Sequence, residues 1–165
     1  MDQKNILIVV VAGIKKKNEW LLIKRERGDY QQKWALVGGK MQFNESIQNA
    51  ILREVFEETG LKVELIGIKA ILNEKLKNIE TGKTMKHFLI FLCHTIFEEG
   101  ELRNTDEGEL KWFSKNEIHN LKQDIIPSDY YMLNVLLERE SLHSIIEIEL
   151  IEGSNKLETN MLEEY

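Results

Sequence analysis

The sequence contains one cysteine and one proline among its 165 residues. Because a lone cysteine, Cys93, excludes an internal disulfide framework, we expect a reducing compartment. Cys93 lies in the apolar run HFLIFLCHTIF, which predicts a buried, unreactive thiol. The longest apolar run, ILIVVVAGI, has nine residues and is too short to cross a bilayer. The lysines that follow it are not typical of a signal-peptide cleavage site. We therefore expect a cytoplasmic protein without membrane association.

The sequence also lacks an excess of basic charge. The formal net charge is −6, and residues 138–165 account for all of it, so residues 1–137 are neutral overall. Without a basic stripe, we do not expect binding to a nucleic-acid polymer. A small phosphorylated ligand stays compatible with this charge if it brings a cation. The hydrophobic content of 42% is sufficient for one core. We predict a single domain over residues 1–152 and an acidic tail over 153–165, either disordered or a short helix.

Apolar and alternating patterns predict strands that outnumber the helices. We expect strands at 5–14, 19–25, 34–39, 61–72, 86–97, 108–112 and 144–152, and helices at about 45–59, 114–121 and 127–140. Asn44 is the expected N-cap of the first helix, and Gly60 its C-terminal cap. This order predicts an α+β fold, a mixed sheet packed between helices. The strand at 144–152 can either close the edge of the sheet or pair across a homodimer.

Three glutamates, Glu54, Glu57 and Glu58, lie within five residues of the first predicted helix. At this spacing they share one face and repel each other, and Arg53 can pair with Glu57 at i+4. A solvated acidic face would explain such a pattern, but this face borders apolar positions, where unpaired charge is costly. Clustered carboxylate oxygens are typical ligands of Mg²⁺ or Mn²⁺. The alternating acids of an EF-hand calcium loop are not present.

The same stretch is similar to the signature of the Nudix hydrolases at every fixed position. The matching residues are Gly39, Glu45, Arg53, Glu54, Val55, Glu57, Glu58, Gly60 and Leu61. The resemblance implies an α/β/α sandwich and the hydrolysis of a diphosphate linked to another group. For Val55, Gly60 and Leu61 we expect structural roles, in the core and as the helix cap.

The resemblance also implies roles for the individual residues. Glu54, Glu57 and Glu58 would bind Mg²⁺, for which Mn²⁺ can substitute, and a backbone carbonyl of Gly38 or Gly39 would add an oxygen. Glu45 would orient Arg53 or bind an outer metal ion through water, and Arg53 would fix the carboxylates. A metal-activated water would then attack phosphorus. Glu54 and Glu107 are the candidate general bases, although the acidic loop around Glu107 is equally explained by solvation.

The identity of the substrate is less well specified. Residues 73–77 lack the proline of the ADP-ribose subgroup, and residues 76–80 lack the tyrosine of the dinucleoside polyphosphate subgroup. The segment from Gly108 to Leu133 resembles MutT-type enzymes, in which an acid after a proline contributes to the base pocket. Asp129 and Ser128 are therefore candidates for base recognition, with stabilisation of a first helical turn as the alternative.

Further substrate-binding candidates are Arg25 and Lys40 for phosphate oxygens, with Arg27 weaker, and Trp34, Tyr30 or Phe43 for stacking on a base. Trp34 is equally suited to the core. The leading prediction is a nucleoside triphosphate diphosphatase that acts on oxidised purines such as 8-oxo-dGTP. Two alternatives stay open: a hydrolase of another linked diphosphate (nucleotide sugar, ADP-ribose or dinucleoside polyphosphate) and a non-catalytic ligand sensor.

Overall fold

The computed structural model describes the whole chain except residues 1–4, 29, 104, 139–143, 154–155 and 165. Within the described part, nine strands form one mixed sheet in the order β3-β2-β1-β6-β5-β8-β9, while β4 pairs with β1 and β7 with β2. The strands are β1 (Leu7–Lys16), β2 (Glu19–Arg25), β3 (Trp34–Ala35), β4 (Val37–Lys40), β5 (Lys62–Asn78), β6 (Thr84–Glu99), β7 (Gly108–Ser114), β8 (Ser144–Gly153) and β9 (Lys156–Glu164). Both parallel and antiparallel pairs occur, as predicted.

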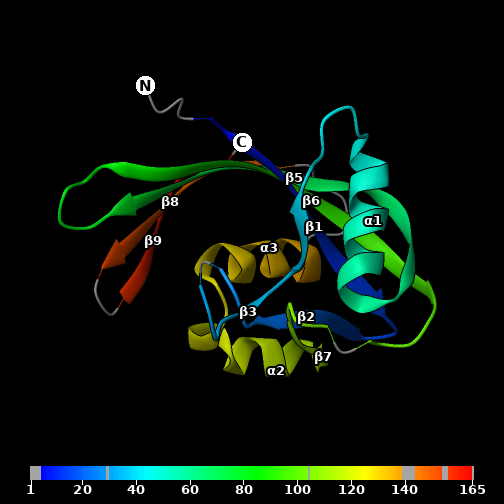
Figure 1. The fold of residues 1–165 in the computed structure, drawn as a ribbon. Coiled ribbons are helices and arrows are strands. Elements are labelled where there is room, and N and C mark those ends of the chain that lie inside the picture. The colour runs from blue at the N-terminus through cyan, green and yellow to red at the C-terminus, as the bar shows by residue number, and fades with distance from the viewer. Residues whose placement is uncertain (1–4, 29, 104, 139–143, 154–155, 165) are drawn as a thin grey trace.

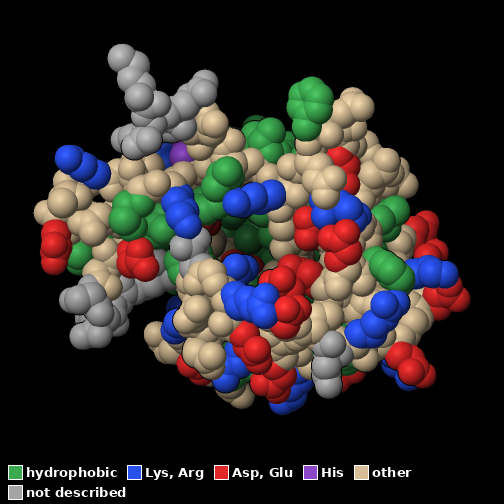
Figure 2. Space-filling view, in the orientation of Figure 1, with side chains coloured by type: hydrophobic (Ala, Val, Ile, Leu, Met, Phe, Trp, Pro, Cys, Tyr) green, Lys and Arg blue, Asp and Glu red, His purple; other side chains and the backbone are tan. Residues whose placement is uncertain are grey.

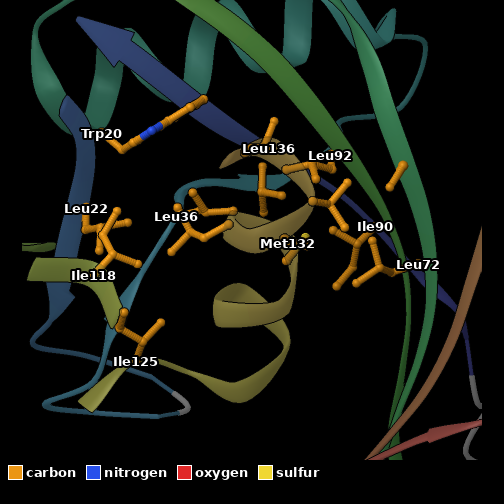
Figure 3. Packing of buried hydrophobic residues seen from close by; sticks show 14 of the residues in the cluster. Trp20, Leu22, Leu36, Leu72, Ile90, Leu92, Ile118, Ile125, Met132 and Leu136 are labelled. Carbon is orange, nitrogen blue, oxygen red and sulfur yellow. The ribbon is translucent and has the colours of Figure 1, made fainter. Parts of the chain in front are cut away.

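The helices cover both faces of this sheet (Figure 1). They are α1 (Ile47–Thr59), α2 (Lys115–Asn120) and α3 (Pro127–Glu138), with a 3₁₀ turn, η1 (Lys122–Asp124), between the last two. One apolar cluster packs around Ala50, Ile51 and Val55 of α1. A second cluster surrounds Met132 and Leu136 of α3 (Figure 3). The two clusters make the predicted α/β/α sandwich, which is confirmed.

The first helix begins at Ile47, two residues later than expected. Ser46, not Asn44, is the N-cap of α1, and its hydroxyl oxygen accepts a hydrogen bond from the Asn49 amide at 3.1 Å. Asn44 has a left-handed backbone, with φ of 62°, so it belongs to the preceding turn. The prediction of Asn44 as the cap is therefore wrong, because its side-chain type alone does not fix its backbone conformation. Gly60 ends the helix in the left-handed conformation, as predicted.

The C-terminal part of the chain extends the sheet. β8 lies between β5, to which it is parallel, and β9, to which it is antiparallel. Residues 156–164, expected as a short helix or disordered, form strand β9 instead. The pairing of β9 with β8 satisfies the hydrogen-bonding groups of both backbones. A polar, acidic sequence alone does not predict such a strand. The boundary of the domain at residue 152 stays a prediction.

Candidate active site

The structure places Glu45 just before α1, and its carboxylate reaches Arg53 through two bonds. Arg53 Nε donates to Glu45 Oε1 at 2.8 Å, and Nη2 donates to Oε2 at 2.9 Å. Side chains of a helix lean toward its N-terminus, which lets Arg53 reach back over two turns. Hydrogen bonds from Arg53 and from the Gln42 backbone lower the pKa of Glu45 to about 2. Glu45 is therefore an anion at neutral pH, and it fixes the position of the Arg53 guanidinium.

Arg53 also holds two of the three clustered glutamates. Its Nη1 donates to Glu54 Oε1 at 2.7 Å and to Glu57 Oε2 at 3.2 Å, and Nη2 reaches the carbonyl oxygen of Lys40 at 3.3 Å. The hydrogen bonds with Glu45, first, and with Glu54 and Glu57 raise the pKa of Arg53 above its ordinary value, against the effect of burial. One partly buried cation thus offsets part of the repulsion between the glutamates, as the i+4 spacing predicted.

The third glutamate, Glu58, is largely buried against β4, the strand that contains Gly38 and Gly39. Its Oε2 accepts a hydrogen bond from the Gly38 amide at 3.2 Å. Burial raises the pKa of Glu58 to about 8, and the charges of Glu54 and Glu107 act in the same direction, while Gly38 and Arg25 oppose them. Glu107, from the loop before β7, and Arg25, from the end of β2, therefore belong to the same electrostatic site.

The two glycines of β4 permit this close approach. A Cβ atom at Gly39 would lie 2.5 Å from Glu54 Oε2, and a Cβ at Gly38 would lie 2.1 Å from the Val10 carbonyl oxygen. Any larger residue at Gly39 would therefore displace the Glu54 carboxylate from the backbone. Hard oxygen donors packed against bare backbone suit a divalent cation, so the residues present fit the predicted metal site.

In the part of the chain that the structure describes, no three His, Cys, Asp or Glu side chains are gathered as a preformed metal site. The ion pairs explain the arrangement of the acids: oxygens of Glu54 and Glu57 point to Arg53, and Glu58 bonds to Gly38. The assignment of Glu54, Glu57 and Glu58 as metal ligands stays a prediction.

These groups line one side of a cleft of about 880 Å³. Figure 2 shows a hollow on this face, with apolar side chains in its floor and charged side chains at its rim. Lys40, Arg25, Arg27 and the three glutamates belong to the lining, as do apolar residues of β1, β6 and α3: Val9, Val11, Phe88, Ile90 and Met132. The cleft therefore combines a charged part with an apolar part.

Two buried acids lie in the apolar part of the cleft. Asp129, at the start of α3, accepts a hydrogen bond at Oδ1 from the Leu36 amide at 2.7 Å. Burial raises the pKa of Asp129 to about 6, opposed by the Leu36 amide and by the charge of Arg25. Burial also raises the pKa of Glu74, on β5, to about 7, opposed by a hydrogen bond from Ser128. Because Arg25 acts on both Glu58 and Asp129, it lies between the two parts.

Most of the predicted substrate-binding residues reach the cleft, but two aromatic candidates do not. Arg25, Tyr30, Lys40, Ser128 and Asp129 line it. Trp34 instead packs edge-on against Phe113 in the core, with ring centroids 4.8 Å apart, so stacking of Trp34 on a base is not supported. Phe43 is fully exposed and outside the lining. Arg27 lines the cleft and pairs with Asp106 at 2.7 Å.

The sequence interpretation missed Glu74, which the structure places in the cleft. Its signal was present in the alternation of β5, because Leu72 and Leu76, two residues before and after it, are both buried. A strand residue between them at period two points to the same face. A carboxylate at position 74 therefore interrupts the buried apolar residues on this face of β5. A polar residue that breaks such a pattern is typical of a functional site.

The family to which the chain belongs gives the class of protein: a hydrolase that acts on phosphoanhydride bonds. The chain belongs to the NUDIX family, since the NUDIX domain model matches residues 2–135. The enzymes of this family are generally dependent on a divalent metal ion and act on nucleoside diphosphate derivatives.

Three relatives illustrate this membership. The ADP-ribose pyrophosphatase of Methanocaldococcus jannaschii is 31% identical over 118 residues, which cover 70% of this chain and 67% of that protein. The oxidized purine nucleoside triphosphate hydrolase of Danio rerio is 34% identical over 98 residues, 59% of this chain and 60% of that protein. The crystal structure of a MutT protein from Bacillus halodurans has a TM-score of 0.76 at 24% identity and covers 94% of this chain and 97% of its own. The last likeness concerns the fold alone.

The described part of the chain contains no helix that is both long and apolar enough to span a membrane.

Proposed function

We propose that the protein is a Mg²⁺-dependent nucleoside triphosphate diphosphatase that releases a nucleoside monophosphate and pyrophosphate, with oxidised purines such as 8-oxo-dGTP as favoured substrates. The observation that carries this proposal is the composition of the cleft. Carboxylates and cations line one part of it, and an apolar part with two buried acids adjoins them. A triphosphate suits the first part, and a base with polar edges suits the second. The Danio rerio relative, named as a hydrolase of oxidised purine nucleoside triphosphates, supports the same substrate class.

In this proposal Glu54, Glu57 and Glu58 would hold Mg²⁺ or Mn²⁺, with a carbonyl oxygen of Gly38 or Gly39. A divalent ion bound there would supply charge neutralisation for the phosphates and a more acidic water. Arg53 keeps the carboxylates in place through its ion pairs.

The remaining charged residues act on the substrate directly. Arg25 and Lys40 donate hydrogen bonds to phosphate oxygens, and Glu54 or Glu107 accepts the proton of the attacking water. Water oxygen bonds to phosphorus as the bridging P–O bond breaks, and pyrophosphate leaves. Ser128 and Asp129 contact the base.

A substrate panel tests this proposal most sharply. The purified protein is incubated with 8-oxo-dGTP, dGTP, ADP-ribose, a nucleotide sugar and a dinucleoside polyphosphate, each with and without Mg²⁺, and pyrophosphate and phosphate are measured. We expect pyrophosphate from the triphosphates, highest for 8-oxo-dGTP, and only with Mg²⁺. The M. jannaschii relative makes ADP-ribose the main competitor. Turnover of ADP-ribose without pyrophosphate release from any triphosphate would contradict the substrate assignment.

A non-catalytic sensor is distinguished by the same panel, since it would bind nucleotides without turnover. Glu57→Gln should abolish pyrophosphate release and leave the fold intact, because the change removes only a charge. The matched control is Glu64→Gln, at an exposed position of β5 outside the cleft, which should keep wild-type activity.

A further inference from the structure

Glu74 is a buried carboxylate that neither the signature nor the ion-pair network of α1 uses. Its neighbours across the sheet are Phe88 on β6 and Ile148 on β8. Only 3% of the residue is exposed, yet it contributes to the lining of the cleft. Figure 3 shows Leu72 of the same strand, Ile90 and Met132 together beside α3, in the apolar cluster that borders this region. Glu74 is thus an acid set into an otherwise apolar wall.

One oxygen of this carboxylate has no hydrogen-bond partner among the described residues. The Ser128 hydroxyl donates a hydrogen bond to the Glu74 carboxylate, whereas Oε2 is buried and unpartnered. Leaving such an acceptor unsatisfied costs about 1–3 kcal/mol. A glutamate that served the fold alone would be expected to have both oxygens occupied. The unsatisfied oxygen in a cleft therefore points to a ligand that donates a hydrogen bond.

The second acid, Asp129, restricts what this ligand can be. Asp129 Oδ1 is already used by the Leu36 amide, and the charge of Asp129 acts on Glu74. Two neighbouring buried carboxyls are not readily both ionised, so near neutral pH one of them carries a proton. Such a pair offers one acceptor and one donor. The edge of uracil also has one N–H beside an oxo acceptor, but a guanine-type edge has two adjacent donors, N1–H and the 2-amino group, beside its 6-oxo acceptor. A guanine-type base therefore offers one more donor to the unsatisfied oxygen.

We propose that Glu74 determines base specificity in this enzyme: its free Oε2 accepts a hydrogen bond from a ring N–H or amino group of a guanine-type base. This inference rests on the proposed function and names a residue that reads the base. The hydrogen bond from Ser128 holds Glu74 within the apolar part of the cleft, and the apolar residues around it contact the faces of the ring.

The test compares the wild type with Glu74→Gln, which removes the charge, and Glu74→Met, which removes the acceptor. The matched control is Glu64→Gln on the same strand. For each protein, kcat and KM are measured with GTP, with ITP, which lacks the 2-amino group, and with UTP, by pyrophosphate release. Thermal melts establish that the variants are folded.

The expected result is that the Glu74 variants lose the preference for GTP over UTP. In Glu74→Met, kcat/KM for GTP falls at least tenfold, mostly through KM, while that for UTP changes less than twofold. For ITP, the fall in kcat/KM is intermediate between those for GTP and UTP. The values of kcat/KM for Glu74→Gln lie between those of Glu74→Met and the wild type. If Glu74 had only a structural role, the substitutions would lower kcat/KM for all three substrates together. The ratio of kcat/KM for GTP to that for UTP would then stay unchanged.

An unchanged ratio in both folded variants overturns the role of Glu74, and leaves the proposed function standing if the wild type still releases pyrophosphate. If the wild type hydrolyses no nucleoside triphosphate, both the proposed function and this inference are wrong.

Discussion

Replacing Glu74 by glutamine should make the stability of the protein less sensitive to pH. Burial and the charge of Asp129 raise the pKa of Glu74 from 4.5 to about 7, against a hydrogen bond from Ser128. A raised carboxyl pKa means that the folded state binds the proton more tightly than the unfolded state. The stabilisation is fully present below about pH 4.5 and is lost as pH rises through about 7. Between pH 5 and pH 8 this loss amounts to about 2–3 kcal/mol.

The assay is urea unfolding at pH 5 and pH 8 for the wild type, Glu74→Gln and the control Glu64→Gln. Asp129, whose pKa is raised to about 6, and Arg25, which faces it, are present in all three proteins. The difference between proteins at each pH therefore reports Glu74 together with its coupling to Asp129. We expect the free energy of unfolding of Glu74→Gln, relative to the wild type, to rise by about 2–3 kcal/mol from pH 5 to pH 8. A difference that stays constant within about 0.5 kcal/mol would refute the reasoning that Glu74 is a buried, poorly paired acid.

Three further predictions address other parts of the structure. Arg53→Gln should lower kcat at least about a hundredfold, because its removal leaves the partly buried carboxylates of Glu45 and Glu54 without their cation; an unchanged kcat in a steady-state assay would contradict the ion-pair network. Ser46→Ala should cost about 1 kcal/mol in urea unfolding and Asn44→Gly clearly less, since Ser46 is the N-cap and glycine keeps the left-handed backbone of residue 44 without strain; equal losses would argue against this cap. Burial raises the pKa of the Cys93 thiol to about 12, so labelling by a thiol reagent at pH 8 should follow global unfolding in urea; rapid labelling of the native protein would show that Cys93 is accessible.

The sequence was sufficient for the features that depend on local periodicity. The apolar stripe of Ile47, Ile51 and Val55 predicted α1, and the i+4 spacing predicted the pair of Arg53 and Glu57, found at 3.2 Å. Gly60 was predicted as the cap and has φ of 75°. Each of these follows from contacts within about two helical turns, where spacing fixes geometry.

Features that depend on tertiary contacts were not available from the sequence. Trp34 is apolar and aromatic, so it suits either a base pocket or the core, and only the position of Phe113 decides for the core. Glu74 enters the cleft because β5 lies beside β6 and α3 packs over them. Strand β9 forms because β8 offers an edge to pair with. Such pairings join residues far apart along the chain, and local propensity does not specify them.

The central claim is that the carboxylates of α1 bind a divalent cation on which hydrolysis depends. The most direct measurement is the rate of pyrophosphate release from 8-oxo-dGTP as a function of Mg²⁺ concentration, for the wild type and Glu57→Gln. We predict no release by the wild type in EDTA, a saturating rise with millimolar Mg²⁺, and no release by folded Glu57→Gln at any of these concentrations. Full activity of the wild type in EDTA, or of Glu57→Gln with Mg²⁺, would contradict the account.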